Sequence, residues 1–198
     1  KSSSEPDLVT EEEILMMVDA GNETGVIEES QREMINNVFE FDDLTVSDIM
    51  THRTDITAVE MSAKVSEVVN AAISSGFSRI PVYEETIDHI AGMICVKDLL
   101  CLVGSESAED TEAKSFMRDI IYLPESVPCG EAFKRLSSLK MQMAAVVDEY
   151  GGTAGLVTME DIVEKIVGNI QDEYDEEEAE LTRISDDTYV IAGTADPE

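Results

Sequence analysis

The sequence predicts a mixed α/β fold of the α+β kind, built from two copies of one βαββα unit. Residues 54–103 and 118–167 share one plan: an extended segment, a helix, two strands and a closing helix. The copies are offset by 64 residues from Ile56 to Ile120 and by 63 residues at their closing helices, so one residue is lost in the turn between the strands. A single copy is near the lower size limit of a stable domain. We therefore expect the copies to pack face to face about a pseudo-twofold axis.

Two helices are expected before the first copy. Thr10 and Glu13 have the spacing of a capping box, which predicts a helix over residues 11–20 that ends at Gly21. A second helix fits residues 28–40, whose apolar side chains recur on one side. The sequence thus predicts a helical lead-in to the paired units.

The first copy begins with an extended segment over residues 55–59, followed by a helix that Gly76 ends. Strands are expected at 79–83 and 90–94, and a closing helix at 96–100. The apolar residues of the first helix recur at helical spacing: Val65, Val68, Val69, Ala72 and Ile73.

The second copy repeats this order. Its extended segment covers residues 119–123, its strands cover 144–147 and 155–158, and its closing helix covers 159–167. The Gly151-Gly152 pair forms the turn between the strands. Its first helix has the apolar face Ala132, Phe133, Leu136 and Leu139.

The composition restricts the class of partner. Of the 198 residues, 43% are hydrophobic, which suffices for a packed core, and the formal net charge is −31. Such a charge repels nucleic acid and anionic membranes, so we expect no nucleic-acid partner, and a phosphate ligand needs a local cationic site.

The three cysteines, Cys95, Cys101 and Cys129, are expected to be reduced thiols. There is no signal peptide or membrane-spanning run, and the first residue is not Met, so we expect a fragment of a longer protein.

Neither catalysis nor a resident metal is expected. His52 and His89 have no nucleophile at a recognisable spacing, and His89 forms no zinc pattern with Cys95 and Cys101. The acidic run over residues 172–180 is expected as a solvated linker, because a flexible run offers Mg²⁺ no fixed geometry. Loose binding of Mg²⁺ by this run is the alternative.

Two stretches resemble the signature of CBS domains, namely Gly92 to Asp98 and Gly155-Leu156-Val157-Thr158-Met159-Glu160-Asp161. The resemblance is closer still to the CorC/hemolysin-C family, bacterial relatives of the cyclin-M magnesium transport mediators. Three segments carry it: Asp48 to Asp55, Ser78 to Tyr83, and Asp148 to Gly155. The family usually has proline where this chain has His52.

The resemblance implies a tandem CBS pair that binds an adenine nucleotide, ATP or AMP, between its copies, with Mg²⁺ accompanying the nucleotide. It implies homodimers formed through the CBS pairs, and a transmembrane domain of the same protein whose magnesium or cobalt efflux the module controls. The chain would then be the cytoplasmic portion of a bacterial inner-membrane protein. Its expected parts are a helical lead-in, CBS repeat 1, CBS repeat 2, an acidic linker and the start of a truncated transporter-associated domain: residues 1–43, 44–105, 112–170, 171–181 and 182–198.

The expected nucleotide site combines both repeats. Asp161 lies in the first turn of the closing helix and can accept hydrogen bonds from both ribose hydroxyls, while Thr158 and the helix N-terminal amides can meet phosphate. By resemblance, the first repeat completes the site with Thr54, Ile56 and Ala58 at the base and Ser78, Arg79, Pro81 and Tyr83 near the ribose and phosphate. The alternative for Asp161 is a purely structural carboxylate at the helix end.

The pseudo-symmetric cleft is expected to be weak or empty, because it lacks the Thr158 hydroxyl and an arginine that matches Arg79. Its residues are Cys95, Asp98, Ile121 and Leu123, which face Met143 and Ala145. The competing function is an interaction module that dimerises, or docks a basic partner, without a nucleotide. Only the nucleotide-binding function needs the constellation of Thr158, Asp161 and Arg79.

Overall fold

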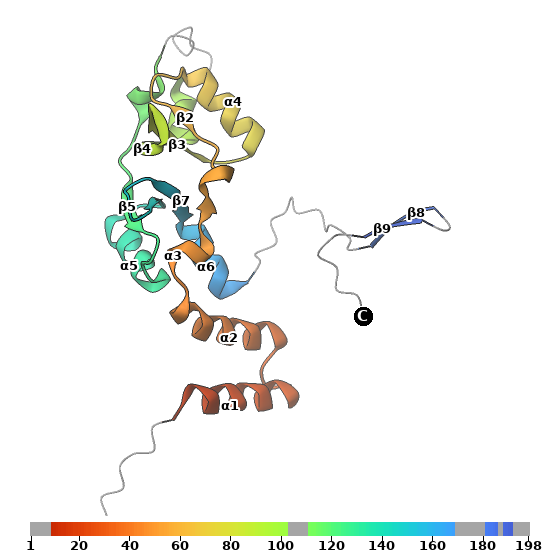
Figure 1. Ribbon diagram of the computed structural model, residues 1–198. Helices are drawn as coiled ribbons and strands as arrows, with labels where there is room; N and C mark the ends of the chain where they lie inside the picture. The colour runs from red at the N-terminus through yellow and green to blue at the C-terminus, as the bar shows by residue number, and fades with distance from the viewer. Residues whose placement is uncertain (1–8, 103–110, 169–180, 186–187, 192–198) are drawn as a thin grey trace, which may run out of the picture. The chain divides into compact units, whose positions relative to one another are not determined.

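The computed structural model describes residues 9–102, 111–168, 181–185 and 188–191, and it divides into one unit that ends at Gly168 and a second that begins at Asn169. The predicted mixture of helices and sheets in two βαββα repeats is confirmed. Figure 1 shows the two repeats of the first unit, each with its own sheet and helices.

The first repeat has a three-stranded sheet in the order β2-β3-β4. β2 pairs in parallel with β3, and β3 pairs antiparallel with β4. Gly76 ends the helix, as predicted, and the structure shows it in the left-handed conformation. The closing helix is a 3-10 helix. The elements are β2 (Val59–Glu60), α4 (Val65–Ser75), β3 (Arg79–Glu84), β4 (Thr86–Cys95) and η2 (Val96–Leu102).

The second repeat has the same connectivity, and its sheet has the order β1-β7-β6-β5. β5 pairs in parallel with β6, and β6 pairs antiparallel with β7. Its closing helix is a regular α-helix, unlike η2. The elements are β5 (Ile121–Pro124), α5 (Cys129–Leu139), β6 (Met143–Val147), β7 (Thr153–Thr158) and α6 (Met159–Val167).

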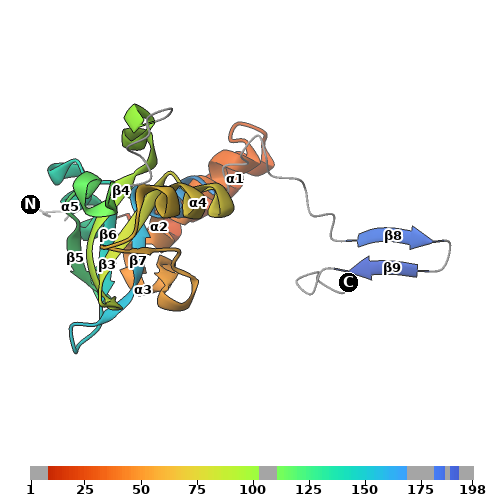
Figure 2. The same cartoon turned by 90° about the horizontal axis from the view of Figure 1, so that it is seen from above.

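Each repeat receives an edge segment from the chain that leads into the other. β1 (Thr51–His52) precedes the first repeat but pairs antiparallel with β7 of the second. Arg118, in the segment that leads into the second repeat, exchanges two backbone hydrogen bonds with Met93 of β4 at 2.8 and 3.0 Å. This exchange of edge segments joins the two repeats, which lie one above the other in Figure 1 and overlap when seen from above in Figure 2. The apolar side chains between them form one cluster: Ile90, Met93, Ile120, Met143, Ala145 and Leu156.

The lead-in consists of α1 (Glu11–Glu23), α2 (Glu29–Asp43) and the short α3 (Val46–Ile49). The capping box of Thr10 and Glu13 is confirmed. The predicted stop at Gly21 is wrong, because α1 continues to Glu23. The side chain of Ile27 lies against Gly21, where a Cβ atom would come within 2.7 Å of it. Close packing therefore explains this glycine.

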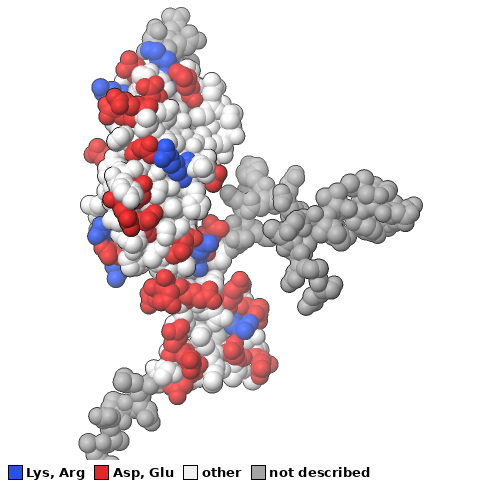
Figure 3. Space-filling view, in the orientation of Figure 1, with Lys and Arg blue, Asp and Glu red and all other residues white. Residues whose placement is uncertain are grey.

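The lead-in packs on the second repeat through α2. Asn37 donates a hydrogen bond to the Ile166 carbonyl of α6 at 3.5 Å, and Phe41 joins the core beneath α5 and α6. Figure 3 shows acidic side chains spread over α1 and α2 on the face in view. Of the helices in the described residues, none combines the length and apolar character that a membrane crossing requires.

The second unit contributes the antiparallel strands β8 (Leu181–Ser185) and β9 (Thr188–Ile191). The predicted strand at Tyr189-Val190-Ile191 is therefore confirmed. The acidic run over residues 172–180 lies outside the described residues.

The three cysteines differ in accessibility, which leads to a prediction. Cys129 is fully buried, and this burial, assisted by the nearby Asp48 carboxylate, raises the pKa of its thiol to about 11. Near pH 8 only about one Cys129 in a thousand would be a thiolate. Cys95 is also buried, whereas Cys101 is exposed.

A water-soluble disulfide reagent should modify one thiol, that of Cys101, rapidly in the native chain and all three thiols after unfolding. Cys101→Ser should remove the rapid phase, and its survival in this variant would contradict the assignment.

Candidate functional site

The beginning of α6 is a reciprocal capping box. The Thr158 hydroxyl accepts from the Asp161 N–H at 3.1 Å, and Asp161 Oδ2 accepts from the Thr158 N–H at 2.8 Å. Both residues are half-buried. No group of the described residues donates to the other carboxylate oxygen, Oδ1. Asp161 thus caps the helix and still has an oxygen free to accept from a ligand.

Arg79 brings the first repeat to this helix end. It begins β3, and its Nη1 atom lies 3.1 Å from Oε1 of Glu160, the neighbour of Asp161. Its side chain is 28% exposed, against 58% for Glu160. Because the pair is partly open to water, its attraction is screened, and an anionic ligand can compete with Glu160 for the guanidinium. The structure therefore places Arg79 at the helix end that the predicted Thr158 and Asp161 cap.

The other predicted site residues of the first repeat divide into two groups. Ile56 and Tyr83 pack against the cluster between the sheets, beside Met143 and Ala145. Pro81 is buried and Ala58 half-buried, whereas Thr54 and Ser78 are exposed. The apolar part of the proposed base slot is therefore formed in part by the contact of the two sheets.

Two residues predicted for the pseudo-symmetric cleft do not face it. Leu123 is fully buried in the core of the second repeat, and Ile121 packs against that same core. Their neighbours face the first repeat instead. Ile120 lies in the cluster between the sheets, and the Tyr122 hydroxyl donates to the Ile90 carbonyl at 2.6 Å. Successive residues of a strand point to opposite faces, so the choice of Ile121 and Leu123, each one position beyond the counterparts of Ile56 and Ala58, exchanged the two sets.

An arginine from outside the repeat nevertheless lies beside the predicted Asp98. Arg118 Nη2 lies 2.6 Å from Oδ2 of Asp98, the counterpart of Asp161. The position equivalent to Arg79 is Met143, so comparison of equivalent positions missed Arg118, which lies in the exchanged edge segment. Because the pairing of that segment with β4 depends on the tertiary arrangement, no spacing in the sequence marks Arg118.

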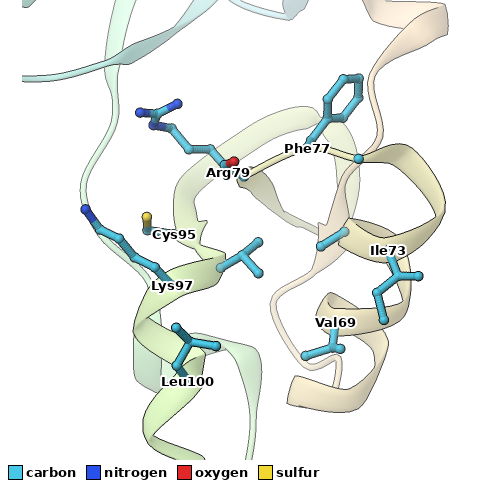
Figure 4. A pocket seen from close by; sticks show the side chains of 11 residues that line it. Val69, Ile73, Phe77, Arg79, Cys95, Lys97 and Leu100 are labelled. Carbon is cyan, nitrogen blue, oxygen red and sulfur yellow. The ribbon is translucent and has the colours of Figure 1, made fainter. Parts of the chain in front are cut away.

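Two cavities adjoin Arg79. The larger, about 560 Å³, is an apolar groove between α4 and η2, with Arg79, Cys95 and Lys97 at one end (Figure 4). The smaller, about 310 Å³, lies between the repeats and is lined by Arg79, Lys97, Arg118, Lys140 and neighbouring residues. Thr158 and Asp161 line neither of these two cavities. In the described residues, no group of three or more His, Cys, Asp or Glu side chains is arranged to hold a metal ion.

Comparison with known proteins gives a consistent set of relatives. The family model described as the CBS domain matches residues 46–104 and 113–168. The chain is 37% identical over 187 residues to the UPF0053 protein YhdP of Bacillus subtilis, covering 93% of this chain and 42% of that protein. It is 36% identical over 193 residues to the magnesium and cobalt efflux protein CorC of Pasteurella multocida, covering 97% of this chain and 64% of the relative. The chain therefore spans only about half the length of such relatives.

Solved structures agree with these relatives. The CBS domain of a bacterial CNNM/CorC family Mg²⁺ transporter superposes with a TM-score of 0.76 at 38% identity, covering 83% of this chain and all of that one. A structure of such a domain in complex with ATP has a TM-score of 0.67 at 39% identity, covering 70% and 97%. A CBS-domain pair with bound AMP from Klebsiella pneumoniae has a TM-score of 0.53 at 28% identity, covering 64% and 100%. None of the proteins named here is described as an enzyme.

Proposed function

Because the chain belongs to the CBS-domain family, as a tandem pair of the CorC/hemolysin C type, we propose that it is the adenine-nucleotide-binding regulatory module of an ion-transport protein. The ATP and AMP complexes of its structural neighbours support this ligand class. The relatives named for magnesium and cobalt efflux support the nature of the controlled domain. The module would then be the cytoplasmic portion of a bacterial inner-membrane protein, attached to its own transmembrane domain.

One observation carries the proposal. The capping box of Thr158 and Asp161 leaves a carboxylate oxygen free at a helix N-terminus, and Arg79 of the other repeat reaches the same helix end. The free Oδ1 atom accepts from the ribose hydroxyls, and Arg79 with the Glu160 N–H of α6 binds phosphate, because the Met159 and Asp161 N–H groups already donate to the Gln142 carbonyl and the Thr158 hydroxyl. Thr54, Ile56 and Ala58 line the base slot, with Ser78, Pro81 and Tyr83 beside it. Asp98 differs in that it forms an ion pair with Arg118 through Oδ2, so a cation already engages the carboxylate that a ribose would need in the second cleft.

Mg²⁺ would enter this site with the nucleotide. The described residues present no acidic cluster for a resident ion. The phosphates of the nucleotide supply the oxygen ligands that Mg²⁺ prefers. Thermal melting with ATP, ADP and AMP, each with and without Mg²⁺, tests the ligand class directly. If none of these ligands raises the melting temperature, the proposed function is contradicted.

The mechanism of control is a population shift. A nucleotide held by groups from both repeats favours the arrangement in which those groups converge, and it can shift the equilibrium only by its differential affinity for that arrangement. Arg79 of the first repeat contacts the end of α6 through Glu160. Closure of the cleft about this arginine is therefore the change that an attached transport domain would sense.

A second function, homodimer formation, is favoured by the apolar groove between α4 and η2. Ile73, Phe77 and Leu100 line it and are 76%, 53% and 66% exposed. A contiguous apolar surface of this kind marks an interaction site. A second copy of the chain is the partner that we propose, in keeping with dimers formed through the CBS pair.

The groove leads to a prediction on oligomeric state. Phe77→Asp places a charge in the groove and should convert the dimer to a monomer, because an unpaired carboxylate cannot be buried cheaply. Size-exclusion chromatography with light scattering measures the mass. Tyr150, which is 94% exposed outside the groove, provides the control, and Tyr150→Asp should remain dimeric. A dimer that survives Phe77→Asp would place the interface elsewhere.

A further inference from the structure

The smaller cavity concentrates positive charge in a strongly acidic chain. Four of the 13 Lys and Arg residues line it, namely Arg79, Lys97, Arg118 and Lys140, although the net charge is −31. Asp119 is the one acidic residue among the lining residues. Like charges that converge on one cavity repel each other, so the arrangement is favourable when an anion occupies the space.

The two lysines carry most of the available charge. Arg79 and Arg118 are already bonded to Glu160 and Asp98. Across the part of the chain that the structure describes, neither Lys97 nor Lys140 has a carboxylate partner. Figure 4 shows Lys97 and Arg79 extending on the same side of the first repeat, with Cys95 between them. Their charges are therefore available to an anion in this cavity.

The cavity adjoins the proposed nucleotide site. Arg79 lines the cavity and bonds Glu160 in the first turn of α6. Gln142, another lining residue, accepts a hydrogen bond at its carbonyl from the Met159 N–H at 2.9 Å. Met159 directly follows Thr158, so one wall of the cavity is bonded to the helix end at which phosphate would bind. A chain of phosphates that begins at Thr158 can continue into the basic cavity.

We propose that this cavity holds the terminal phosphates of the nucleotide, and that Lys97 and Lys140 select a triphosphate over a monophosphate. The inference rests on the proposed function, since Asp161 is taken to hold the ribose. A monophosphate ends at Arg79 and the Glu160 N–H of α6, and it leaves the two lysines without an anion. A triphosphate has more charge and more acceptor oxygens, which the lysines meet with charge-assisted hydrogen bonds.

The test is isothermal titration of the chain with ATP, AMP and inorganic tripolyphosphate. Lys97→Gln combined with Lys140→Asn removes both charges, and asparagine tolerates the left-handed backbone that Lys140 adopts at φ 55°. We expect ATP to bind about tenfold more weakly for each lysine removed, with AMP affinity unchanged. Lys114→Gln combined with Lys134→Gln is the matched control, because both lysines are exposed and line neither cavity.

The outcomes separate this inference from the proposed function. Equal losses for ATP and AMP, or equal losses in the control variant, would show only a general charge effect and would overturn the inference. Tripolyphosphate that binds as tightly as ATP, with no further gain from the nucleoside, would make the cavity an independent polyphosphate site and would also overturn it. AMP binding as tightly as ATP in the original chain would remove the inference and leave the proposed function standing. A chain that binds none of the three would remove both.

Discussion

Asp161→Ala is expected to abolish the rise in melting temperature that nucleotide produces. With ATP at a hundred times its Kd, the original chain should gain about 2.7 kcal/mol, or about 5–11 °C for a chain of this size. The variant loses the acceptor for the ribose hydroxyls, so the rise should vanish. Without ligand, the variant should lose only about 0.5–1.5 kcal/mol, because one hydrogen bond to the Thr158 N–H is removed. Thermal melting with and without ATP measures both effects.

A second capping box provides the matched control. Thr45 and Asp48 cap α3 as Thr158 and Asp161 cap α6, and the Thr45 N–H donates to Asp48 Oδ2 at 2.8 Å. Hydrogen bonds from the hydroxyl and N–H of Thr45 lower the pKa of Asp48, so it is ionised near neutral pH, as the bonds require. Asp48→Ala should weaken the cap and keep the full response to nucleotide. Asp98→Ala should change that response much less than Asp161→Ala, and the reverse order would assign the ligand to the other cleft.

Gly155→Ala is expected to cause, together with Gly92→Ala, the largest loss of stability among glycine-to-alanine changes in the described residues. A Cβ atom at Gly155 would lie 2.5 Å from the Thr51 carbonyl oxygen of the exchanged segment β1 and 2.7 Å from the Met50 sulfur. The carbonyl belongs to the backbone, so a strand must move. Overpacking of this kind costs about 1–3 kcal/mol, equivalent to about 2–12 °C in melting temperature. Chemical denaturation gives the free energy directly.

Gly130→Ala is the control for this prediction. Gly130 lies in α5, and the nearest atom to an added Cβ would be Phe41 Cε1 at 3.9 Å, an ordinary contact. Alanine there should stabilise the chain by about 0.5–1 kcal/mol, because glycine is unfavourable within a helix. Gly92, the counterpart of Gly155, meets the Arg118 carbonyl at 2.6 Å and should behave as Gly155 does. If Gly155→Ala leaves the free energy of unfolding unchanged, β1 can move to make room for the methyl group without an energetic cost.

Local signals were sufficient for most elements of the fold, but the extended segment expected over residues 55–59 begins in a 3-10 helix and is a strand only at Val59–Glu60. The strand pairs and α4 with its terminal Gly76 follow from periodicity and one glycine, and the similarity of the two copies indicated the pseudo-twofold arrangement. The closing helix of the first repeat was harder, since propensity does not separate a 3-10 helix from a short α-helix. The exchange of edge segments has no local signal, because two-residue pairing depends on where the chain enters the other repeat.

The same distinction applies to the site. Thr158 and Asp161 lie three residues apart at one helix end, so the contact between their side chains and backbone was predictable. Ile121 and Leu123 were placed in the wrong layer because a one-residue shift reverses the facing of a strand. The convergence of Lys97, Arg118 and Lys140 depends on three separate segments that only tertiary packing brings together. No spacing rule relates these three residues in the sequence.

The exchanged edge segments also bear on how the two clefts could come to differ. A free half-molecule would expose an unpaired strand edge and could cover it with a second identical half. Such a symmetric assembly holds the same side chains in both clefts, so a substitution in one is imposed on the other. In a single continuous chain each cleft can vary alone, as the pairs Arg79–Glu160 and Arg118–Asp98 do. Duplication thus preserves a symmetric scaffold while allowing one cleft to specialise.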